Sequence, residues 1–333
     1  MIPCSAPRLQ TRWQNELANA ITDPRILLEY LELPTSLLQG ANLASEHFSM
    51  RVPWSFVYRM QKGCPDDPLL LQVLPVHDET IEDTDSSLDP VGDIDSSVCD
   101  GVLHKYQGRV LLITTAACAV HCRYCFRRHF PYQQQHAGGG QWQQSLEYIR
   151  NDSSIEEVIL SGGDPLSLSD ARLQSLTASI DEISHVKRLR IHTRFPIMLP
   201  SRITSAMLDW INALRMEVIF VVHCNHAAEI NDEVSAAISK LRSTSALLLN
   251  QAVLLGGIND TIEAQYALQS RLIRTGILPY YLHMLDRVQG AVHFDVNRDK
   301  AHALLQAMRE QLPGYMVPRM VEEVSGQPHK LPL

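Results

Sequence analysis

The sequence predicts an α/β protein whose core is a partial (βα)6 barrel of the TIM type, preceded by an N-terminal helical region. Short β-rich runs recur mostly about 30 residues apart, at residues 110–115, 158–161, 188–193, 218–223, 246–253 and 278–283. Segments with helical apolar spacing separate these runs, and such alternation is typical of a parallel sheet. Six units are too few to close an eight-stranded barrel, so we expect an open one.

The C-terminal ends of the six runs carry polar residues. These residues are Thr114 and Thr115, Ser161 to Asp164, Thr193 and Arg194, His223, Asn250 and Gln251, and His283. Because reactive residues of parallel α/β proteins gather at the C-terminal ends of strands, we expect the functional site at this edge.

Three segments are expected along the chain. Residues 1–99 form a helical region and an acidic linker, residues 100–300 the barrel, and residues 301–333 a C-terminal helix and a final segment. The stretch 78–100 holds nine Asp or Glu and no Lys or Arg, mixed with Ser, Pro and Gly. This composition predicts a solvated, mobile connection.

Composition excludes several classes of partner. A net charge of −8 supplies no positive field for nucleic acid or an anionic membrane, and 45% hydrophobic with 20% charged residues is typical of a soluble globular protein. The first residues lack the apolar core of a signal peptide, and no apolar run is long enough to span a bilayer. We therefore expect a cytoplasmic protein with no membrane or nucleic-acid partner.

Three of the seven cysteines are packed together as Cys118, Cys122 and Cys125, with C-x3-C-x2-C spacing after the first predicted strand. Three thiolates in one loop can hold three irons of a [4Fe–4S] cube, which leaves the fourth iron free to bind a small molecule. The alternatives are a zinc site completed by His121 or His129, or three buried free cysteines. Zinc sites usually pair two C-x2-C units, and only one is present.

This loop on a partial barrel resembles the radical S-adenosylmethionine (SAM) superfamily. The resemblance implies reductive cleavage of SAM into methionine and a 5′-deoxyadenosyl radical, with an external one-electron reductant. It implies that Tyr124 packs on the adenine and that the strand end at Ser161, Gly162, Gly163 and Asp164 contacts the methionine part. Further SAM contacts are expected from Thr193, Arg194, His223 and Gln251.

The flanking residues narrow the resemblance to lysine 2,3-aminomutases, which combine SAM with pyridoxal phosphate (PLP). Matching stretches run over roughly residues 100–330, among them His104 to Arg109, Leu160 to Pro165 and Pro279 to Asp286. TDP at 22–24, RVP at 51–53, PDDPLL at 65–70 and CRYCFRRHFPY at 122–132 look closest to the branch that supplies β-lysine for elongation factor P.

The resemblance also implies roles for individual residues. Lys330 matches the lysine that binds PLP covalently, while Lys105, Tyr106 and Arg109 lie where the family holds the PLP phosphate and ring. Lys105 replaces an arginine there, and His283 stands where better-known relatives have a tyrosine.

Substrate recognition is expected to follow charge. Arg127 matches the arginine that binds the α-carboxylate of lysine, and Asp286 and Glu323 match two acids that receive its ε-ammonium. Two carboxylates in one buried pocket are costly without a cation to pair, which favours lysine over a glutamate-like substrate.

The expected function is therefore a PLP- and SAM-dependent radical isomerase that converts L-α-lysine to β-lysine, the R enantiomer by resemblance. A separate ligase would attach the product to elongation factor P. A producer of free β-lysine for osmolyte or antibiotic synthesis stays open, as does a non-catalytic iron–sulfur or zinc protein. The chain stops at Leu333, without the extension that carries zinc-binding cysteines in longer relatives, so no structural zinc is expected, and the oligomeric state is left open.

Overall fold

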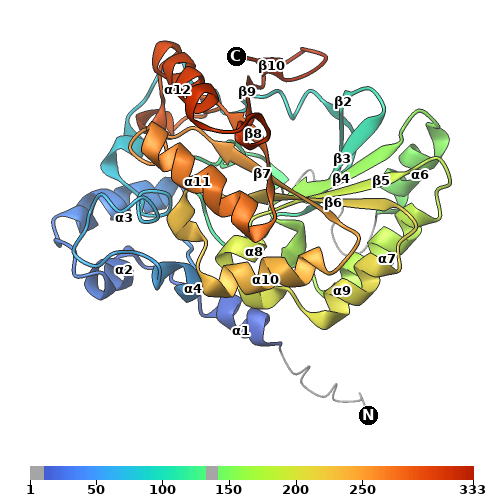
Figure 1. Cartoon of the computed structure of the whole chain (residues 1–333), viewed down its shortest axis with the longest axis horizontal. Coiled ribbons are helices and arrows are strands. Elements are labelled where there is room, and N and C mark those ends of the chain that lie inside the picture. The colour runs from blue at the N-terminus through green and yellow to red at the C-terminus, as the bar shows by residue number, and fades with distance from the viewer. Residues whose placement is uncertain (1–10, 133–141) are drawn as a thin grey trace.

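The computed structural model describes residues 11–132 and 142–333. In this part of the chain, ten strands form one sheet in chain order (Figure 1). The strands are β1 (Ser97–Cys99), β2 (Val102–Tyr106), β3 (Arg109–Thr115), β4 (Glu157–Gly162), β5 (Arg188–Thr193), β6 (Glu217–His223), β7 (Leu247–Val253), β8 (Leu278–His283), β9 (Arg319–Glu322) and β10 (Leu331–Pro332).

All six strands expected from the sequence are present, as β3 to β8, and each pairs in parallel with the next. A further parallel strand, β9, follows the six predicted units and has no helix after it among the described residues; this strand was not predicted. β9 has four residues and comes directly after Pro318, which leaves too short an apolar run to recognise. β1, β2 and β10 add antiparallel edges, and among the described residues no pairing joins the two ends of the sheet. The expected open, partial barrel is confirmed.

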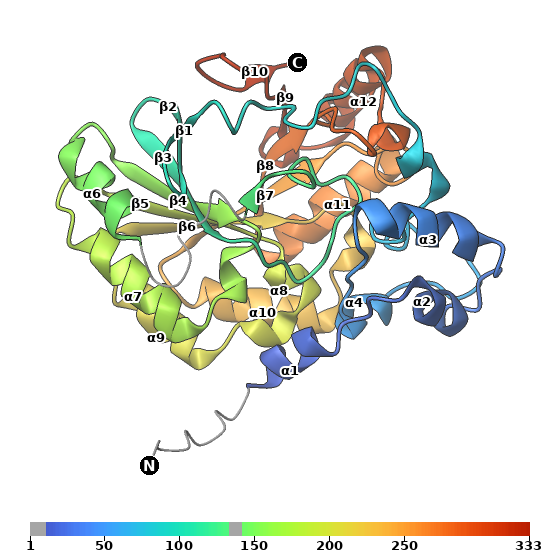
Figure 2. The same ribbon diagram turned by 180° about the vertical axis from the view of Figure 1, so that it is seen from behind.

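Helices cover the outer face of this sheet. They are α6 (Gln143–Asn151), α7 (Asp170–Asp181), α8 (Phe195–Met198), α9 (Ser205–Asn212), α10 (Asp232–Arg242), α11 (Ile262–Thr275) and α12 (Arg298–Gln311). Figures 1 and 2 show α7, α9, α10 and α11 on one side of the sheet, and β2 and β10 on the other. None of the described helices is both long and apolar enough to cross a membrane.

Side-chain caps fix where these helices begin. An oxygen of the residue before the helix accepts a hydrogen bond from the backbone N–H three residues on, at Ser169, Thr204, Asn231, Thr261 and Asn297. Each such cap stabilises a helix by about 1 kcal/mol. The helices therefore start directly after the loops that carry the site residues.

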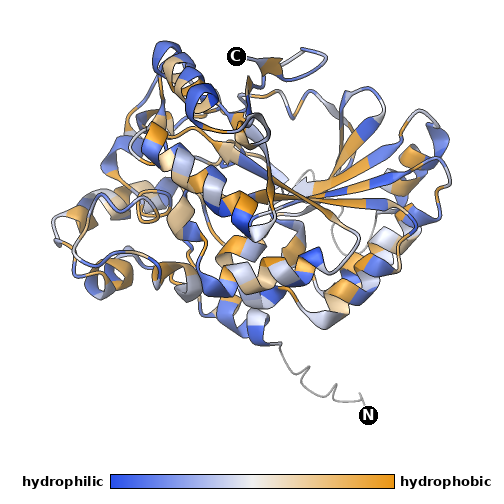
Figure 3. Ribbon diagram, in the orientation of Figure 1, coloured by the Kyte–Doolittle hydropathy of each residue, from blue (hydrophilic) through white to orange (hydrophobic). Residues whose placement is uncertain are grey.

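The N-terminal region contains α1 (Arg12–Ala18), α2 (Pro24–Tyr30), α3 (Leu37–His47) and α4 (Trp54–Val57). It shares a hydrophobic core with the barrel, since Trp13 packs edge-on against Phe195 of α8 with ring centroids 6.1 Å apart. Figure 3 shows hydrophobic residues running through the strands and along parts of these helices. The division of the chain into three segments stays a prediction.

Short 3-10 helices complete the connections. They are η1 (His77–Thr80), η3 (Pro165–Ser167), η4 (Pro200–Arg202), η5 (Ala227–Glu229), η6 (Val292–Phe294) and η7 (Gly314–Met316). Both η1 and η5 bring a buried glutamate toward the cysteine loop.

The acidic stretch 78–100 is not uniformly solvated, and here the sequence-based expectation was wrong. Glu79 and Asp93 are buried, with 6% and 2% of their surface exposed. Glu79 accepts hydrogen bonds from Arg123 at 2.6 Å and 2.8 Å and from Arg128 at 2.7 Å. The stretch is drawn inward because buried arginines of the cysteine loop require anions.

Glu79→Gln is expected to lower the free energy of unfolding by about 3–5 kcal/mol, because it leaves two buried guanidinium groups without their anion. Urea denaturation measures the change. Glu82→Gln, at an exposed position of the same stretch, is the matched control and should change stability by less than about 0.5 kcal/mol. Equal effects of the two substitutions would show that the buried pairs do not stabilise the fold.

Candidate active site

One cavity of about 670 Å³ lies inside the partial barrel. Every site residue predicted from the sequence lines it, and their individual roles stay predictions. These residues are Lys105, Tyr106, Arg109, Cys118, Cys122, Tyr124, Cys125, Arg127, Ser161, Gly162, Gly163, Asp164, Thr193, Arg194, His223, Gln251, Asp286, Glu323 and Lys330.

The cysteine loop leaves β3 and is held against the end of β4 by close backbone packing. Gly163 donates its N–H to the Thr115 carbonyl at 2.7 Å, and a Cβ at Gly163 would lie 2.5 Å from the Ala117 oxygen. Gly162 has a backbone φ of +111°, which residues other than glycine rarely adopt. The two glycines are therefore needed to seat the cysteine loop, whatever they contact in a ligand.

Burial dominates the chemistry of the three thiols. It raises the pKa of Cys118 well above its usual range and the pKa of Cys125 to about 11, and neighbouring thiols add to both shifts. Within the described residues, no three His, Cys, Asp or Glu side chains are arranged to hold one metal ion. An iron–sulfur cube instead binds each thiolate to a different iron and neutralises thiolates that would repel one another. The donor set fits such a cluster.

The Asp164 carboxylate is hydrogen-bonded to other groups of the protein. It accepts hydrogen bonds from the Thr193 hydroxyl at 2.7 Å, the Arg194 backbone N–H at 2.7 Å and the Leu166 backbone N–H at 3.1 Å. Burial nevertheless raises the pKa of Asp164 to about 6. Asp164 thus ties the ends of β4 and β5 together, and a contact with SAM stays a prediction.

A row of alternating charges crosses the other side of the cavity. Arg127 Nε lies 2.6 Å from Asp93, Asp93 lies 2.5 Å from Lys105 Nζ, and Lys105 Nζ lies 3.1 Å from Glu323. Glu323 also forms an ion pair with Lys330. We refer to Arg127, Asp93, Lys105, Glu323 and Lys330 as the charge row.

The charge row sets the protonation of its two acids. Burial alone would raise the pKa of Glu323, but Lys330 and Lys105 lower it to about 2. Burial also opposes ionisation of Asp93, while Arg127 and Lys105 hold its pKa below the usual value. Both acids are therefore carboxylates at neutral pH.

Asp286 faces the same end of the cavity and behaves differently. It is partly buried at the end of β8, and burial together with Glu323 raises its pKa to about 7. The two acids expected to receive the substrate ammonium thus both lie near Lys330, and one of them can exchange a proton at neutral pH.

Cations that line the cavity differ in availability. Lys105 Nζ already serves three acceptors, Asp93, Glu323 and the Val91 carbonyl at 2.8 Å. Arg109 stacks over the Tyr106 ring at 4.5 Å and has no ion pair among the described residues. Nη2 of Arg127 also has no partner there, since Nε binds Asp93 and Nη1 binds Ser161. Among the described residues that line the cavity, Arg109, Nη2 of Arg127 and Arg319 are free to bind anions.

Three histidines, of which His283 is buried and His192 and His223 are partly buried, add buried ring nitrogens without partners. In the described part of the chain, Nε2 of His192, His223 and His283 has no hydrogen-bond partner, and all three rings line the cavity. Burial lowers their pKa values, to about 4 for His223, so the rings are neutral. Buried polar atoms usually have partners, so these three are suited to a polar ligand.

Several known proteins are similar in sequence to this chain. A family model described as a 4Fe-4S single cluster domain matches residues 106–213, which include the cysteine loop. The L-lysine 2,3-aminomutase of Escherichia coli K12 is 44% identical over 323 residues, covering 96% of this chain and 94% of that protein. The chain belongs to the L-lysine 2,3-aminomutase family.

Two further L-lysine 2,3-aminomutases are similar to this chain over most of its length. The L-lysine 2,3-aminomutase of Haemophilus influenzae is 42% identical over 97% of this chain and 96% of its own length. That of Clostridium subterminale is 30% identical over 96% of this chain and 77% of its own length. A solved radical SAM methyltransferase from Sphaerobacter thermophilus, at 16% identity and a TM-score of 0.43, covers 66% of this chain and 68% of its own, and carries no further argument.

Membership of the L-lysine 2,3-aminomutase family confirms the predicted enzyme class, an isomerase of the aminomutase type, and the predicted iron–sulfur cluster loop on a partial barrel. The non-catalytic alternative is thereby rejected. Sequence reasoning missed Asp93, Gln72 and Glu229. Asp93 is one of nine acids in its stretch and nothing in the sequence distinguishes it from the others.

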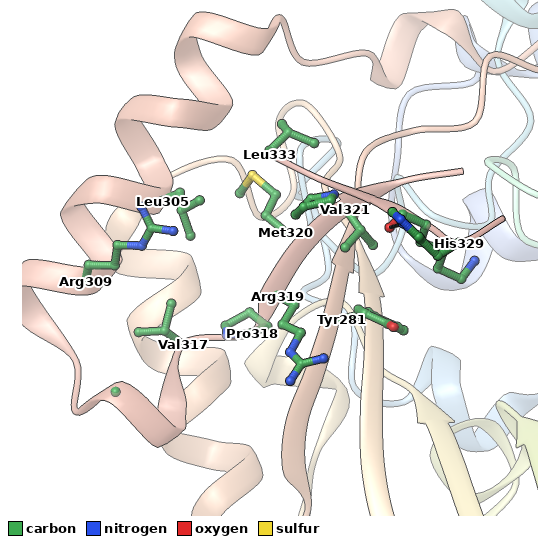
Figure 4. Close-up of a pocket in the computed structure, with 13 residues that line it drawn as sticks. Tyr281, Leu305, Arg309, Val317, Pro318, Arg319, Met320, Val321, His329 and Leu333 are labelled. Atoms are coloured by element: carbon green, nitrogen blue, oxygen red, sulfur yellow. Dashed lines mark hydrogen bonds between the residues drawn. The ribbon is translucent and has the colours of Figure 1, made fainter. Parts of the chain in front are cut away.

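A second cavity, of about 570 Å³, is lined by Lys330 of the charge row among other residues. Leu305 and Arg309 of α12 line it, together with Arg319 and Met320 of β9 and the C-terminal Leu333 (Figure 4). It shares Tyr281, Arg319, His329 and Lys330 with the larger cavity. The segment that carries Lys330 is therefore a thin wall between two cavities.

Replacement of Cys118, Cys122 or Cys125 by Ser is expected to abolish cluster binding, because each thiolate holds a separate iron. After anaerobic reconstitution, iron analysis should find about four atoms per wild-type chain and far fewer in each variant. Cys64→Ser, outside the cavity, is the control and should retain the full iron content. Retention of the cluster in any of the three variants would remove that cysteine from the ligand set.

Proposed function

We propose that this chain converts L-α-lysine to (R)-β-lysine with SAM and PLP, and that the product is destined for elongation factor P. The family and the cavity described above support the reaction class. The assignment of lysine, SAM and PLP to particular residues is the proposal.

One observation carries the choice of substrate. The ε-ammonium of Lys330 forms an ion pair with Glu323 inside the cavity, near Asp286. This is the same chemical group as the side-chain end of a free lysine. Glu323 and Asp286 therefore already form a site for an alkylammonium ion, as the match to the ε-ammonium acids implies.

The rest of the charge row suits the other end of the substrate. Nη2 of Arg127 is free to bind the α-carboxylate, while Nε donates to Asp93 at 2.6 Å and Nη1 to Ser161 at 3.1 Å. Holding both ends of a flexible substrate fixes its reacting atoms in position, and such positioning accounts for a large part of the rate acceleration of many enzymes.

PLP would be held by Lys330 and Arg109. Arg109 is a free cation that can bind a phosphate, while Lys105 acts mainly by joining Asp93 to Glu323. When bound, the cluster and SAM supply a carbon-centred radical, and PLP supplies the π-system across which the amino nitrogen moves. Lys330 must lose a proton to bond to PLP, and Asp286, with a pKa of about 7, can accept one at neutral pH.

The destination of the product is inferred from the branch resemblance, with TDP at 22–24, RVP at 51–53 and the block at 122–132. A β-lysine producer for osmolyte or antibiotic synthesis would use the same chemistry. The two destinations of β-lysine are distinguished by measuring the mass of elongation factor P after deletion of the gene for this chain. Loss of a β-lysyl group supports the proposal, and an unchanged mass rejects it.

The reaction is tested by incubating the reconstituted chain with L-lysine, SAM, PLP and dithionite, then analysing for β-lysine. Lys330→Ala is expected to abolish both the product and the visible absorbance of protein-bound PLP, because no amine remains to bond to the aldehyde. Lys300→Ala, whose lysine pairs with Asp260 on the surface, is the control and should retain both. A PLP band that survives in Lys330→Ala would reject that assignment.

Lysine affinity should depend on pH through Asp286. Below its pKa of about 7 this group is a neutral carboxyl, so ammonium binding must expel a proton, and affinity should weaken about tenfold per pH unit below that value and level off above it. Asp286→Asn should remove this dependence and raise KM by a factor equivalent to about 2–5 kcal/mol.

The measurement is KM for lysine as a function of pH. Asp295→Asn, in a partly exposed ion pair with Arg287 outside the cavity, is the control and should retain the wild-type profile. If Asp286→Asn kept the pH dependence and the KM of the wild type, Asp286 would not contact the ammonium.

A further inference from the structure

We propose that Arg194, held by Glu229, is a positioning residue that raises the reduction potential of the iron–sulfur cluster through a hydrogen bond to Cys122. The inference rests on the cluster-binding part of the proposed function and is independent of lysine and PLP. It concerns how easily the cluster accepts the electron that starts the reaction.

The side chain of Arg194 points at a predicted cluster ligand. Nη1 donates to Cys122 Sγ at 2.8 Å, and only 5% of the residue is exposed. Its backbone is fixed as well, since the Arg194 N–H donates to Asp164 at 2.7 Å. A cation with little rotational freedom therefore lies against this sulfur.

Glu229 binds the second terminal nitrogen of the Arg194 guanidinium group. Its Oε2 accepts from Arg194 Nη2 at 3.0 Å, while Oε1 accepts from the backbone N–H groups of Asn225 and His226, both at 2.9 Å. Glu229 is completely buried in η5, after β6. The carboxylate contacts Nη2, while Nη1 contacts Cys122, so it is the cation and not the anion that is hydrogen-bonded to the sulfur.

Gln72 completes the support from the N-terminal region. Its Oε1 accepts from Arg194 Nη2 at 2.6 Å and from Asn225 Nδ2 at 3.0 Å, and its Nε2 donates to Glu229 at 3.2 Å and to the Pro68 carbonyl at 2.9 Å. Asn225 also donates to the Tyr124 hydroxyl at 2.7 Å. The N-terminal region, β6 and the cysteine loop thus meet in one buried polar network.

A purely structural arginine in this chain is arranged differently. Arg202 is also fully buried, and its Nε and Nη2 donate to the carbonyls of Leu166 and Leu168 while Nη1 pairs with Asp170 at 2.7 Å. Arg194 instead directs Nη1 at a thiol, and its buried Nε has no partner within the described residues. Arg194 thus pairs one terminal nitrogen with an anion, as Arg202 does, but donates from the other to a thiol, which offsets less of the cost of desolvation than an anion would.

The electrostatic consequence has a definite sign. One-electron reduction adds negative charge, which is shared by the cluster and its thiolates, and hydrogen bonds to those sulfurs stabilise the reduced form. Arg194 favours reduction, and Glu229 offsets part of that effect while holding the guanidinium in place. Loss of the cation and loss of the anion should therefore move the potential in opposite directions.

The test is a redox titration of the reconstituted full chain with dithionite and mediators, followed by electron paramagnetic resonance, in the absence of SAM, PLP and lysine. Arg194→Met should lower the ratio of reduced to oxidised cluster about tenfold at fixed potential, which corresponds to about 59 mV. Glu229→Gln removes the negative charge, leaves one amide oxygen where two carboxylate oxygens accepted, and should raise the ratio of reduced to oxidised cluster. Arg202 is a buried arginine that does not line the cavity, so Arg202→Met should leave the ratio of reduced to oxidised cluster unchanged.

Potentials equal to wild type in both variants, or shifted in the same direction, would overturn the proposal. If Arg194→Met fails to retain iron, Glu229→Gln decides: an upward shift supports the proposal and any other result rejects it. β-Lysine formation by the wild type is measured separately. If β-lysine forms while the potentials stay unshifted, only this inference falls. If the potentials shift as expected without β-lysine, only the substrate assignment falls.

Discussion

Among the described residues no strand pairing joins the two ends of this open sheet, and only an isolated backbone bridge, Ser87 to Val288, links the segment before β1 to the loop after β8, so side-chain contacts between the two ends matter. The charge row makes such a contact, since Lys105 on β2 binds Glu323, which follows β9 at the other end of the sheet. Asp93 joins the same lysine to Arg127 of the cysteine loop. Arg127 and Asp93 are buried and the other three members of the row are partly buried, and burial of charge is costly unless neighbours have the opposite sign, as they do here. The shape of the cavity therefore depends on this row.

The same interactions prepare the cavity for a ligand of matching charge. The row has three cations and two anions, and the nearby Asp286 is partly neutral at pH 7. An amino acid with one carboxylate and a distal ammonium can pair with Arg127 at one end and with the two acids at the other. The cluster loop lies on the wall between β3 and β4, where Arg194 and Glu229 support it. Substrate recognition and radical initiation thus use neighbouring but separate groups of charges.

Much of this was accessible from the sequence, because periodicity and motif spacing are local signals. The strands β3 to β8 and the common location of the cysteines, Arg127 and Lys330 were all predicted. β9 was missed because four residues after a proline give no periodic pattern. Asp93, Gln72 and Glu229 were missed because their importance lies in partners 34 or more residues away, Arg127 for Asp93 and Arg194 for the other two. Long-range pairing of this kind leaves no trace in local composition.

The most direct test is an anaerobic crystal structure of the chain with cluster, SAM, PLP and L-lysine bound. The account predicts that the substrate ε-ammonium replaces that of Lys330 between Glu323 and Asp286, with the α-carboxylate on Nη2 of Arg127 and Asp93 still bridging Arg127 and Lys105. A lysine bound in the reverse direction, or one that leaves Glu323 paired with Lys330, would contradict it.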